Sequence, residues 1–175
     1  ATLVDAKYFY CITYTKLSGT TISNELICYD IESWTEVSRK AIPLTTISTD
    51  MTWNPADQKV YGAFYNTTKN GYVFGTLDLE TGAVNKLSDI TLQDDKGYPA
   101  GFVVIAANSI GEIYGISQMG DLYKFNTEDG SYSLIGATGY TPLYQQSGCF
   151  DFTTKQLYWA ACNENSSGIY QVNTD

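Results

Sequence analysis

Histidine is absent from the 175 residues of this chain. Without an imidazole, Ser/His/Asp catalysis, Cys/His catalysis and His-ligated metal chemistry are all excluded. The four cysteines form no C-x-x-C pair, so the short ligand spacing of zinc sites and dithiol redox sites is also missing. Asp94 and Asp95 stand together, but they offer too few oxygen ligands for calcium. The sequence therefore predicts no metal ion and no cofactor.

Long apolar runs and positive charge are also scarce. No uninterrupted apolar run exceeds six residues, the length of Phe102 to Ala107, whereas a membrane-spanning helix needs roughly 18. The chain has 10 Lys and Arg against 19 Asp and Glu, which gives a net charge of −9. Such a charge repels phosphate backbones and anionic lipids. We therefore expect no nucleic-acid partner and no membrane insertion.

What the chain does contain is aromatic residues, among them 15 tyrosines. Short runs rich in Tyr, Val, Ile, Phe and Thr alternate with clusters of Gly, Asn, Asp, Ser and Pro. No stretch keeps a helical period of 3.6 residues, and no linker divides the chain. This pattern predicts an all-β protein with a single domain.

Comparison of the chain with itself reveals a repeat. Apolar or aromatic runs recur at spacings of 48, 48 and 47 residues, and they end at Asp30, Asp78, Asn126 and Asn173. After two of these positions the chain reaches a glycine, Gly82 or Gly130, as a hairpin turn requires. Each unit therefore reads as four strands, A to D, in about 48 residues.

Four antiparallel strands repeated at this length are typical of a β-propeller blade. The segments 111–116 and 120–127 resemble the blades of bacterial secreted and cell-surface propellers, many of uncharacterised function. The resemblance covers nearly the whole chain. It implies an all-β β-propeller of four-stranded antiparallel blades. It also implies an exported protein, located in the periplasm, on the cell surface or outside the cell.

The repeat divides the chain into about four blades. We expect them at about 1–47, 48–92, 98–140 and 145–175. Most of strand A is missing from the first blade, and the fourth ends before its strand D. We therefore expect part of a larger ring of six to eight blades, in preference to a compact four-bladed ring. The remaining blades would come from the same or a second chain, because exposed sheet edges need covering.

The predicted ligand site lies where the D-to-A and B-to-C connections meet on one face. The D-to-A loops are long and aromatic, and rings beside amides and carboxylates suit sugars or peptides. The candidate binding residues are Tyr98, Tyr140, Tyr144, Gln145, Gln146, Asp50 and Asp95. Two alternatives remain open: the tyrosines pack between blades, and Asp94 with Asp95 forms a solvated acidic corner.

These features favour a non-catalytic binding or scaffolding module that presents loops to a glycan or protein partner. One alternative is a glycoside hydrolase or lyase that uses carboxylates at the channel mouth, such as Asp50 and Asp95. Another is a structural support domain of a longer polypeptide. No residue set identifies a catalytic site.

The four cysteines leave two possibilities open. Cys11 and Cys28 fall on neighbouring strands of the first blade, and Cys149 and Cys162 on neighbouring strands of the fourth. Two cross-strand disulfides are conceivable, but buried free thiols explain the pattern as well.

Overall fold

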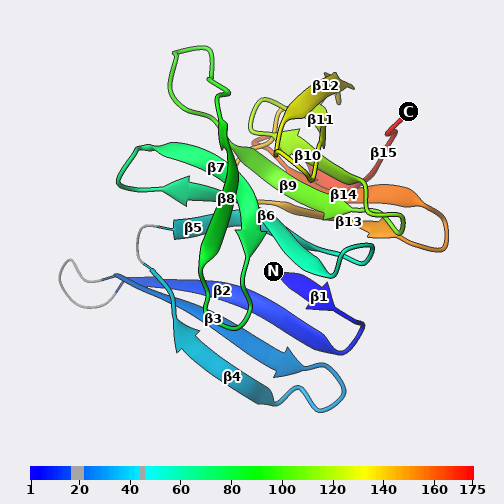
Figure 1. The fold of residues 1–175 in the computed structure, drawn as a ribbon. Coiled ribbons are helices and arrows are strands. Elements are labelled where there is room, and N and C mark those ends of the chain that lie inside the picture. The colour runs from blue at the N-terminus through cyan, green and yellow to red at the C-terminus, as the bar shows by residue number, and fades with distance from the viewer. Residues whose placement is uncertain (17–21, 44–45) are drawn as a thin grey trace.

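The computed structural model describes residues 1–16, 22–43 and 46–175. These residues form fifteen strands joined by turns, and no helix occurs among them (Figure 1). None of the described segments is therefore a helix that could cross a membrane.

The strands form four antiparallel sheets in which neighbours in sequence pair with each other. The first sheet contains β1 (Thr2–Val4), β2 (Tyr8–Lys16), β3 (Ile22–Asp30) and β4 (Glu36–Ala41). The second contains β5 (Thr46–Asn54), β6 (Lys59–Asn66), β7 (Gly71–Leu77) and β8 (Val84–Ile90). The third contains β9 (Phe102–Ala107), β10 (Ile113–Ser117), β11 (Asp121–Phe125) and β12 (Tyr132–Ala137). The fourth contains β13 (Ser147–Asp151), β14 (Gln156–Cys162) and β15 (Ser167–Val172).

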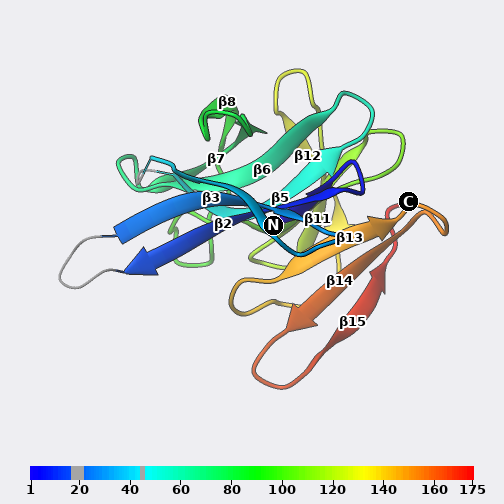
Figure 2. The ribbon, with the colours of Figure 1, turned by 90° about the horizontal axis from the view of Figure 1, so that it is seen from below.

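The four sheets are the blades of a β-propeller, which confirms the predicted fold. Their first strands pack side by side around the axis in the order β1, β5, β9 and β13. Figure 2 shows the three strands of the fourth sheet, β13, β14 and β15, lying next to one another. All six residues of β9 are buried, because β9 lies between β5 and β13. As the sequence indicated, β1 is short, with three residues, and the fourth sheet has three strands within the described chain.

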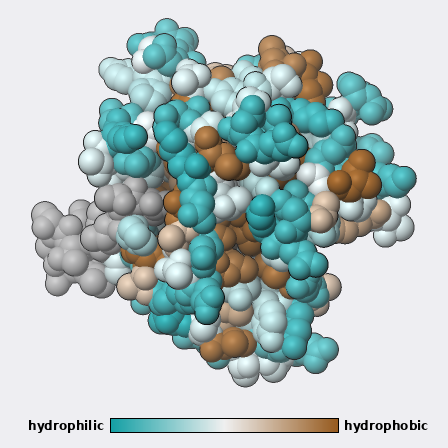
Figure 3. All heavy atoms as spheres, in the orientation of Figure 1, coloured by the Kyte–Doolittle hydropathy of each residue, from teal (hydrophilic) through white to brown (hydrophobic). Residues whose placement is uncertain are grey.

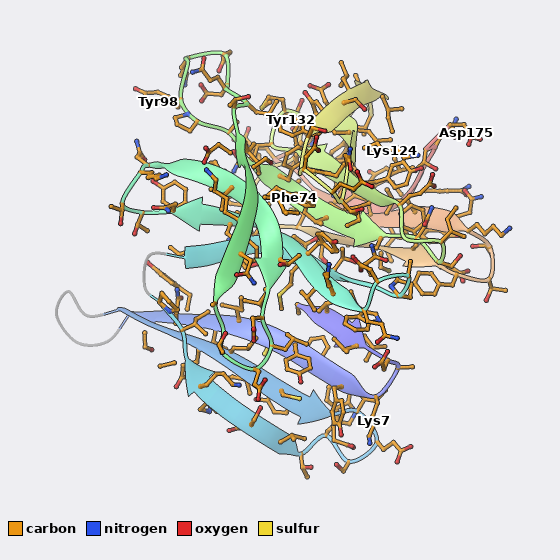
Figure 4. The ribbon with its side chains drawn as sticks, in the orientation of Figure 1. Lys7, Phe74, Tyr98, Lys124, Tyr132 and Asp175 are labelled. Carbon is orange, nitrogen blue, oxygen red and sulfur yellow. The ribbon has the colours of Figure 1, made fainter. Side chains whose placement is uncertain are left out.

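Among the described residues, the hydrophobic core forms three clusters, each between two neighbouring sheets. Between the second and third sheets, Phe74 stacks on Phe125 with ring centroids 4.1 Å apart, and Tyr132 packs against the same ring (Figure 4). A blade buries its apolar faces only against its neighbours, so stacking around the axis provides the core. On the outside, hydrophilic residues cover most of the face seen in Figure 3, and apolar residues appear as separate patches.

The hairpin turns form where the repeat predicted them. Asp78 Oδ1 accepts hydrogen bonds from the backbone N–H groups of Glu80 and Thr81, at 2.8 and 2.7 Å. Gly82 then adopts a φ of +73°, a conformation that glycine takes without steric cost. A Cβ on Gly82 would lie 2.2 Å from Cγ2 of Ile42, the residue that follows β4 of the first sheet. Gly82 therefore closes its own hairpin, and because it has no Cβ it also allows Ile42 of the neighbouring blade to pack closely against the turn.

The cysteines are free thiols in the structure, so the disulfide alternative is not realised. Cys28 is buried and Cys149 is exposed, while Cys11 and Cys162 are half-buried. Burial raises the pKa of the Cys11 thiol.

Candidate functional site

A pocket of about 400 Å³ opens on the face where strands A begin and strands B end. It lies between the second, third and fourth sheets. Residues from β5, β6, β7 and β9, with the segments that follow β10 and precede β13, line it. The lining residues are Ile47, Thr49, Tyr65, Tyr72, Phe102, Val103, Gln118, Pro142, Leu143, Tyr144 and Gln145. We call this the tyrosine pocket.

Two tyrosines of one hairpin form the first wall of the tyrosine pocket. Tyr65 is the last residue but one of β6 and Tyr72 is the second residue of β7, and their ring centroids lie 5.1 Å apart. Tyr65 Oη donates a hydrogen bond to Asn70 Oδ1 in the connecting turn, at 2.5 Å. The direct register between β6 and β7 places both rings on the same side of the sheet, because opposite residues share a face.

The Gln118 side chain supplies a fixed amide beside these rings. Gln118 Oε1 accepts a hydrogen bond from the Gly101 N–H at 3.0 Å, and its Nε2 reaches Tyr72 Oη at 3.5 Å. Position 101 must be glycine here, because a Cβ would lie 2.6 Å from Tyr72 Cδ1. The amide and the ring therefore hold each other in place, which is the preorganisation that a binding site needs.

Tyr144 stands at the opposite side of the pocket in a strained conformation. Its φ is +66°, in the left-handed region that residues with a Cβ rarely adopt, and its side chain is 81% exposed. Strain of this kind persists where the surrounding structure enforces it, and it is concentrated at functional sites. Tyr144 thus presents a nearly free ring beside a rigid wall.

The loop that carries Tyr144 is held by its neighbour Gln146. Gln146 Nε2 donates hydrogen bonds to the carbonyl oxygens of Leu143 and Cys162, so this amide fastens the loop to β14. Leu143 N–H in turn donates to Cys162 O at 2.9 Å. Of the predicted loop residues, Gln145 lines the pocket with Tyr144, whereas Gln146 supports the loop from behind.

The remaining predicted site residues lie elsewhere. Tyr140 packs its ring against Trp159 and Tyr170 and donates a hydrogen bond to Ser166 O, so it is engaged by the fourth sheet and does not line the tyrosine pocket. Tyr98 and Asp95 belong to a loop that projects away from the body of the propeller (Figure 4). The structure therefore brings Tyr144 and Gln145 together and separates them from Tyr98, Asp95 and Tyr140.

Asp50 lies in the interior, with a relative exposure of 4%. Its Oδ2 accepts a hydrogen bond from the Ile105 N–H of β9 at 2.9 Å, and the Ser147 hydroxyl of β13 also interacts with it. Burial raises the pKa of the Asp50 carboxyl to about 7, although these hydrogen bonds act in the opposite direction. This carboxyl joins three inner strands and does not reach the tyrosine pocket.

Sequence reasoning missed Tyr65, Tyr72 and Gln118. Tyr65 and Tyr72 sit near strand ends, where apolar alternation predicts core residues of a blade, and Gln118 lies in the turn after β10. The signal that could have found them is the prediction that B-to-C connections share a face with the D-to-A loops. Clusters of three or more His, Cys, Asp or Glu that could hold a metal ion do not occur in residues 1–16, 22–43 and 46–175.

Comparisons with known proteins reveal fold similarity only. No family model and no curated protein matches the sequence. Among solved structures, the chain resembles hydrazine synthase of Kuenenia stuttgartiensis, with a TM-score of 0.61, 16% identity, and coverage of 99% of this chain and 58% of the other. A Bacteroides thetaiotaomicron protein of unknown function has a TM-score of 0.63 and 13% identity, with 99% and 43% coverage. TolB from Acinetobacter baumannii has a TM-score of 0.57 and 14% identity, with 99% and 40% coverage. The chain thus spans between two fifths and three fifths of the length of these structures, and shares the propeller fold with them.

Proposed function

We propose that this protein is a non-catalytic binding module whose tyrosine pocket takes uncharged sugar units of a glycan. One observation carries the proposal: the rings of Tyr65, Tyr72 and Tyr144 line one pocket of about 400 Å³ together with the amides of Gln118 and Gln145. A pocket of this size lies within the range of small-molecule sites.

The chemistry of the pocket suits a sugar. A pyranose ring has flat apolar faces and a rim of hydroxyl groups, so it stacks on a tyrosine ring and bonds laterally to amides. The pocket offers both kinds of group, and Gln118 is already oriented by Gly101 and Tyr72. A neutral ligand also avoids repulsion by the net charge of −9.

The enzymatic alternative receives less support. None of the pocket-lining residues in the described chain carries a carboxylate. Hydrolysis by the usual mechanism needs a pair of carboxyl groups on either side of the scissile bond. Asp50 is buried between inner strands, and Asp95 stands on the projecting loop, so neither reaches a ligand in this pocket.

Export to the periplasm, the cell surface or the medium belongs to the same proposal. It rests on the resemblance of the blades to secreted and cell-surface propellers. A glycan is also a partner that an exported protein meets. Fractionation of the producing cells, followed by immunoblotting, tests it, and a protein found only in the cytoplasm would contradict it.

A glycan array followed by calorimetric titration tests the binding function. We expect a neutral oligosaccharide to bind, and Tyr144→Ala to weaken binding roughly tenfold, which is about 1.4 kcal/mol. Tyr98→Ala is the matched control, since Tyr98 is another exposed loop tyrosine but lies outside the pocket.

Two results would contradict the proposal. One is the absence of any bound oligosaccharide at millimolar concentration. The other is binding that Tyr144→Ala leaves unchanged while Tyr98→Ala abolishes it, because the ligand would then occupy the projecting loop. If a captured protein binds at the tyrosine pocket and Tyr144→Ala abolishes this binding, the ligand of the pocket is a protein and the glycan proposal is wrong.

A further inference from the structure

Part of the wall of the tyrosine pocket is apolar. Five of the eleven lining residues have side chains without a polar atom: Ile47, Phe102, Val103, Pro142 and Leu143. A hydroxyl group that is pressed against such a wall loses its water and gains no partner, which costs free energy. The apolar part of the pocket therefore suits a hydrocarbon group better than the hydroxyl rim of a simple sugar.

Gln118 offers a hydrogen-bond donor to a ligand in this pocket. Gln118 and Gly101 are joined twice, because the Gln118 N–H donates to Gly101 O at 2.9 Å and the Gly101 N–H donates to Gln118 Oε1 at 3.0 Å. A backbone N–H can only donate, so this bond decides which end of the side-chain amide is the oxygen. The other end, Nε2, carries two N–H groups, and its one partner among the described residues is Tyr72 Oη at 3.5 Å. At least one N–H of Gln118 is therefore available to a ligand.

Thr49 offers an acceptor. In the pairing of β5 with β6, Thr49 is the extra residue of a β-bulge, and bulges redirect the side chain that they carry. The Thr49 side chain lines the pocket, and its hydroxyl donates its single hydrogen to Ala63 O at 3.1 Å. The Thr49 oxygen can therefore only accept a hydrogen bond from a ligand.

An acetamido group complements these three features of the pocket. Its carbonyl oxygen accepts a hydrogen bond, its N–H donates one, and its methyl is a small hydrocarbon group. A hydroxyl group can use the donor or the acceptor, but it leaves the aliphatic wall without a contact. Among the described residues, none that lines the pocket carries a formal charge, so a carboxylate or an ammonium group would find no counter-charge there.

From these observations we infer that the tyrosine pocket selects neutral sugars that carry an N-acetyl group, an inference that rests on the binding function proposed above. The acetamido carbonyl accepts from Gln118 Nε2, and the acetamido N–H donates to Thr49 Oγ1. The methyl packs against the aliphatic wall, while the pyranose ring stacks on a tyrosine. The ligand class is therefore a glycan that contains 2-acetamido hexose units.

Sugars that differ only at C2 test this selectivity. Titration calorimetry compares N-acetylglucosamine with glucose, N-acetylgalactosamine with galactose, and chitotriose with cellotriose. In at least one pair, we expect the N-acetyl member to bind roughly tenfold more tightly, because it adds a hydrogen bond and a buried methyl. Saturation-transfer NMR of that sugar should give the acetyl methyl protons the strongest signal, since they contact the protein directly.

Gln118→Glu isolates the donor. Glutamate keeps an oxygen for the Gly101 N–H and replaces Nε2 by a second oxygen, which cannot donate. We expect the variant to weaken every sugar and the N-acetyl sugar most, so that the preference within the pair falls to about threefold or less. Gln93→Glu is the matched control, because it adds the same charge on the projecting loop, outside the pocket, and should leave the preference unchanged.

Thr49→Val tests the acceptor separately. Valine keeps the branched shape of the side chain and removes the hydroxyl, and we expect it to lower the preference for the N-acetyl sugar roughly fivefold. Urea denaturation shows whether each variant folds. If Gln118→Glu does not fold, the result for Thr49→Val decides.

The outcomes distinguish this inference from the proposed function. If a neutral glycan binds at the tyrosine pocket but the two members of every pair bind equally, the inference is wrong and the proposed function stands. If no sugar binds, both are wrong. The inference is also wrong if Gln118→Glu weakens both members of a pair equally, because the amide would then bond to a group that they share. Binding of N-acetylalanine methylamide as tightly as the N-acetyl sugar would show that the pocket recognises an amide without a sugar, and a peptide would then be the ligand.

Discussion

Asp50 on β5 accepts a hydrogen bond from the backbone N–H of Ile105 on β9, so a carboxyl side chain joins the inner strands of two blades. Hydroxyl groups make the same kind of link nearby. Thr52 Oγ1 accepts from the Ala107 N–H at 3.0 Å, and Thr2 Oγ1 accepts from the Trp53 N–H at 2.8 Å. Inner strands of neighbouring blades belong to separate sheets, and side-chain acceptors satisfy their backbone donors.

Asp50 should make the stability of the protein depend on pH. Burial raises its folded-state pKa to about 7, while the pKa in the unfolded chain is near the ordinary value of 3.8. Between these values the unfolded chain releases a proton that the folded chain keeps. The free energy of unfolding should therefore fall as pH rises from about 4 to 7, by up to about 1.4 kcal/mol per pH unit. Urea denaturation at several pH values measures this slope.

Asp50→Asn is the matched variant for that slope. Asn keeps an acceptor for the Ile105 N–H and cannot ionise, so the variant should gain stability relative to the natural chain between pH 5 and pH 8. Asp95→Asn, on the exposed projecting loop, should show no such change. Equal pH profiles for the natural chain and Asp50→Asn would contradict the assignment.

Gly82→Ala should destabilise the contact between the first two blades. The new methyl would meet Ile42 Cγ2 at 2.2 Å, and the φ of +73° adds strain. Gly97→Ala separates the backbone strain from the steric clash. Gly97 also has a positive φ, of +80°, but a Cβ added there would meet nothing within 4 Å. We expect a loss of about 1 kcal/mol for Gly97→Ala and roughly 3 kcal/mol for Gly82→Ala, measured by urea denaturation. Equal losses would show that Ile42 moves aside without cost.

Thiol titration should distinguish the cysteines by burial. In the folded protein, Cys149 is exposed and should react first with a disulfide reagent, whereas the buried Cys28 should react only after unfolding. All four thiols should react in denaturant without a reductant. Fewer than four would mean that a disulfide forms.

The blades could be predicted from the sequence because their determinants are local. Asp78 and Gly82 lie four residues apart and set the turn themselves, and the spacing of such turns gives the repeat. The tyrosine pocket depends instead on which distant strand ends meet. Tyr72 reaches Gln118 across 46 positions of sequence, and Gln118 carries no local signal of that contact.

Asp50 and Tyr140 were predicted as ligand-binding residues, but both lie outside the tyrosine pocket. The pairing of β5 with β6 shifts between Ser48 and Asp50, and a shift of one residue exchanges the faces of a strand. Asp50 therefore points into the interior instead of the channel mouth. The residues at this bulge do not predict it from the sequence. The sequence left two roles open for Tyr140, ligand binding and packing between blades. In the structure its ring packs against Trp159.

Tyr144→Gly should reveal the strain at the tyrosine pocket. The left-handed conformation costs a residue with a Cβ about 1–2 kcal/mol, whereas a glycine costs about 0.5–1 kcal/mol in chain entropy. Because the Tyr144 side chain is 81% exposed, its removal forfeits little packing. The variant should therefore be as stable as the natural chain or up to about 1 kcal/mol more stable in urea denaturation. Tyr98→Gly, at an exposed tyrosine with ordinary φ, should lose about 0.5–1 kcal/mol. If both variants lose stability equally, Tyr144 is held by contacts of its ring, and the strain is not kept for ligand binding.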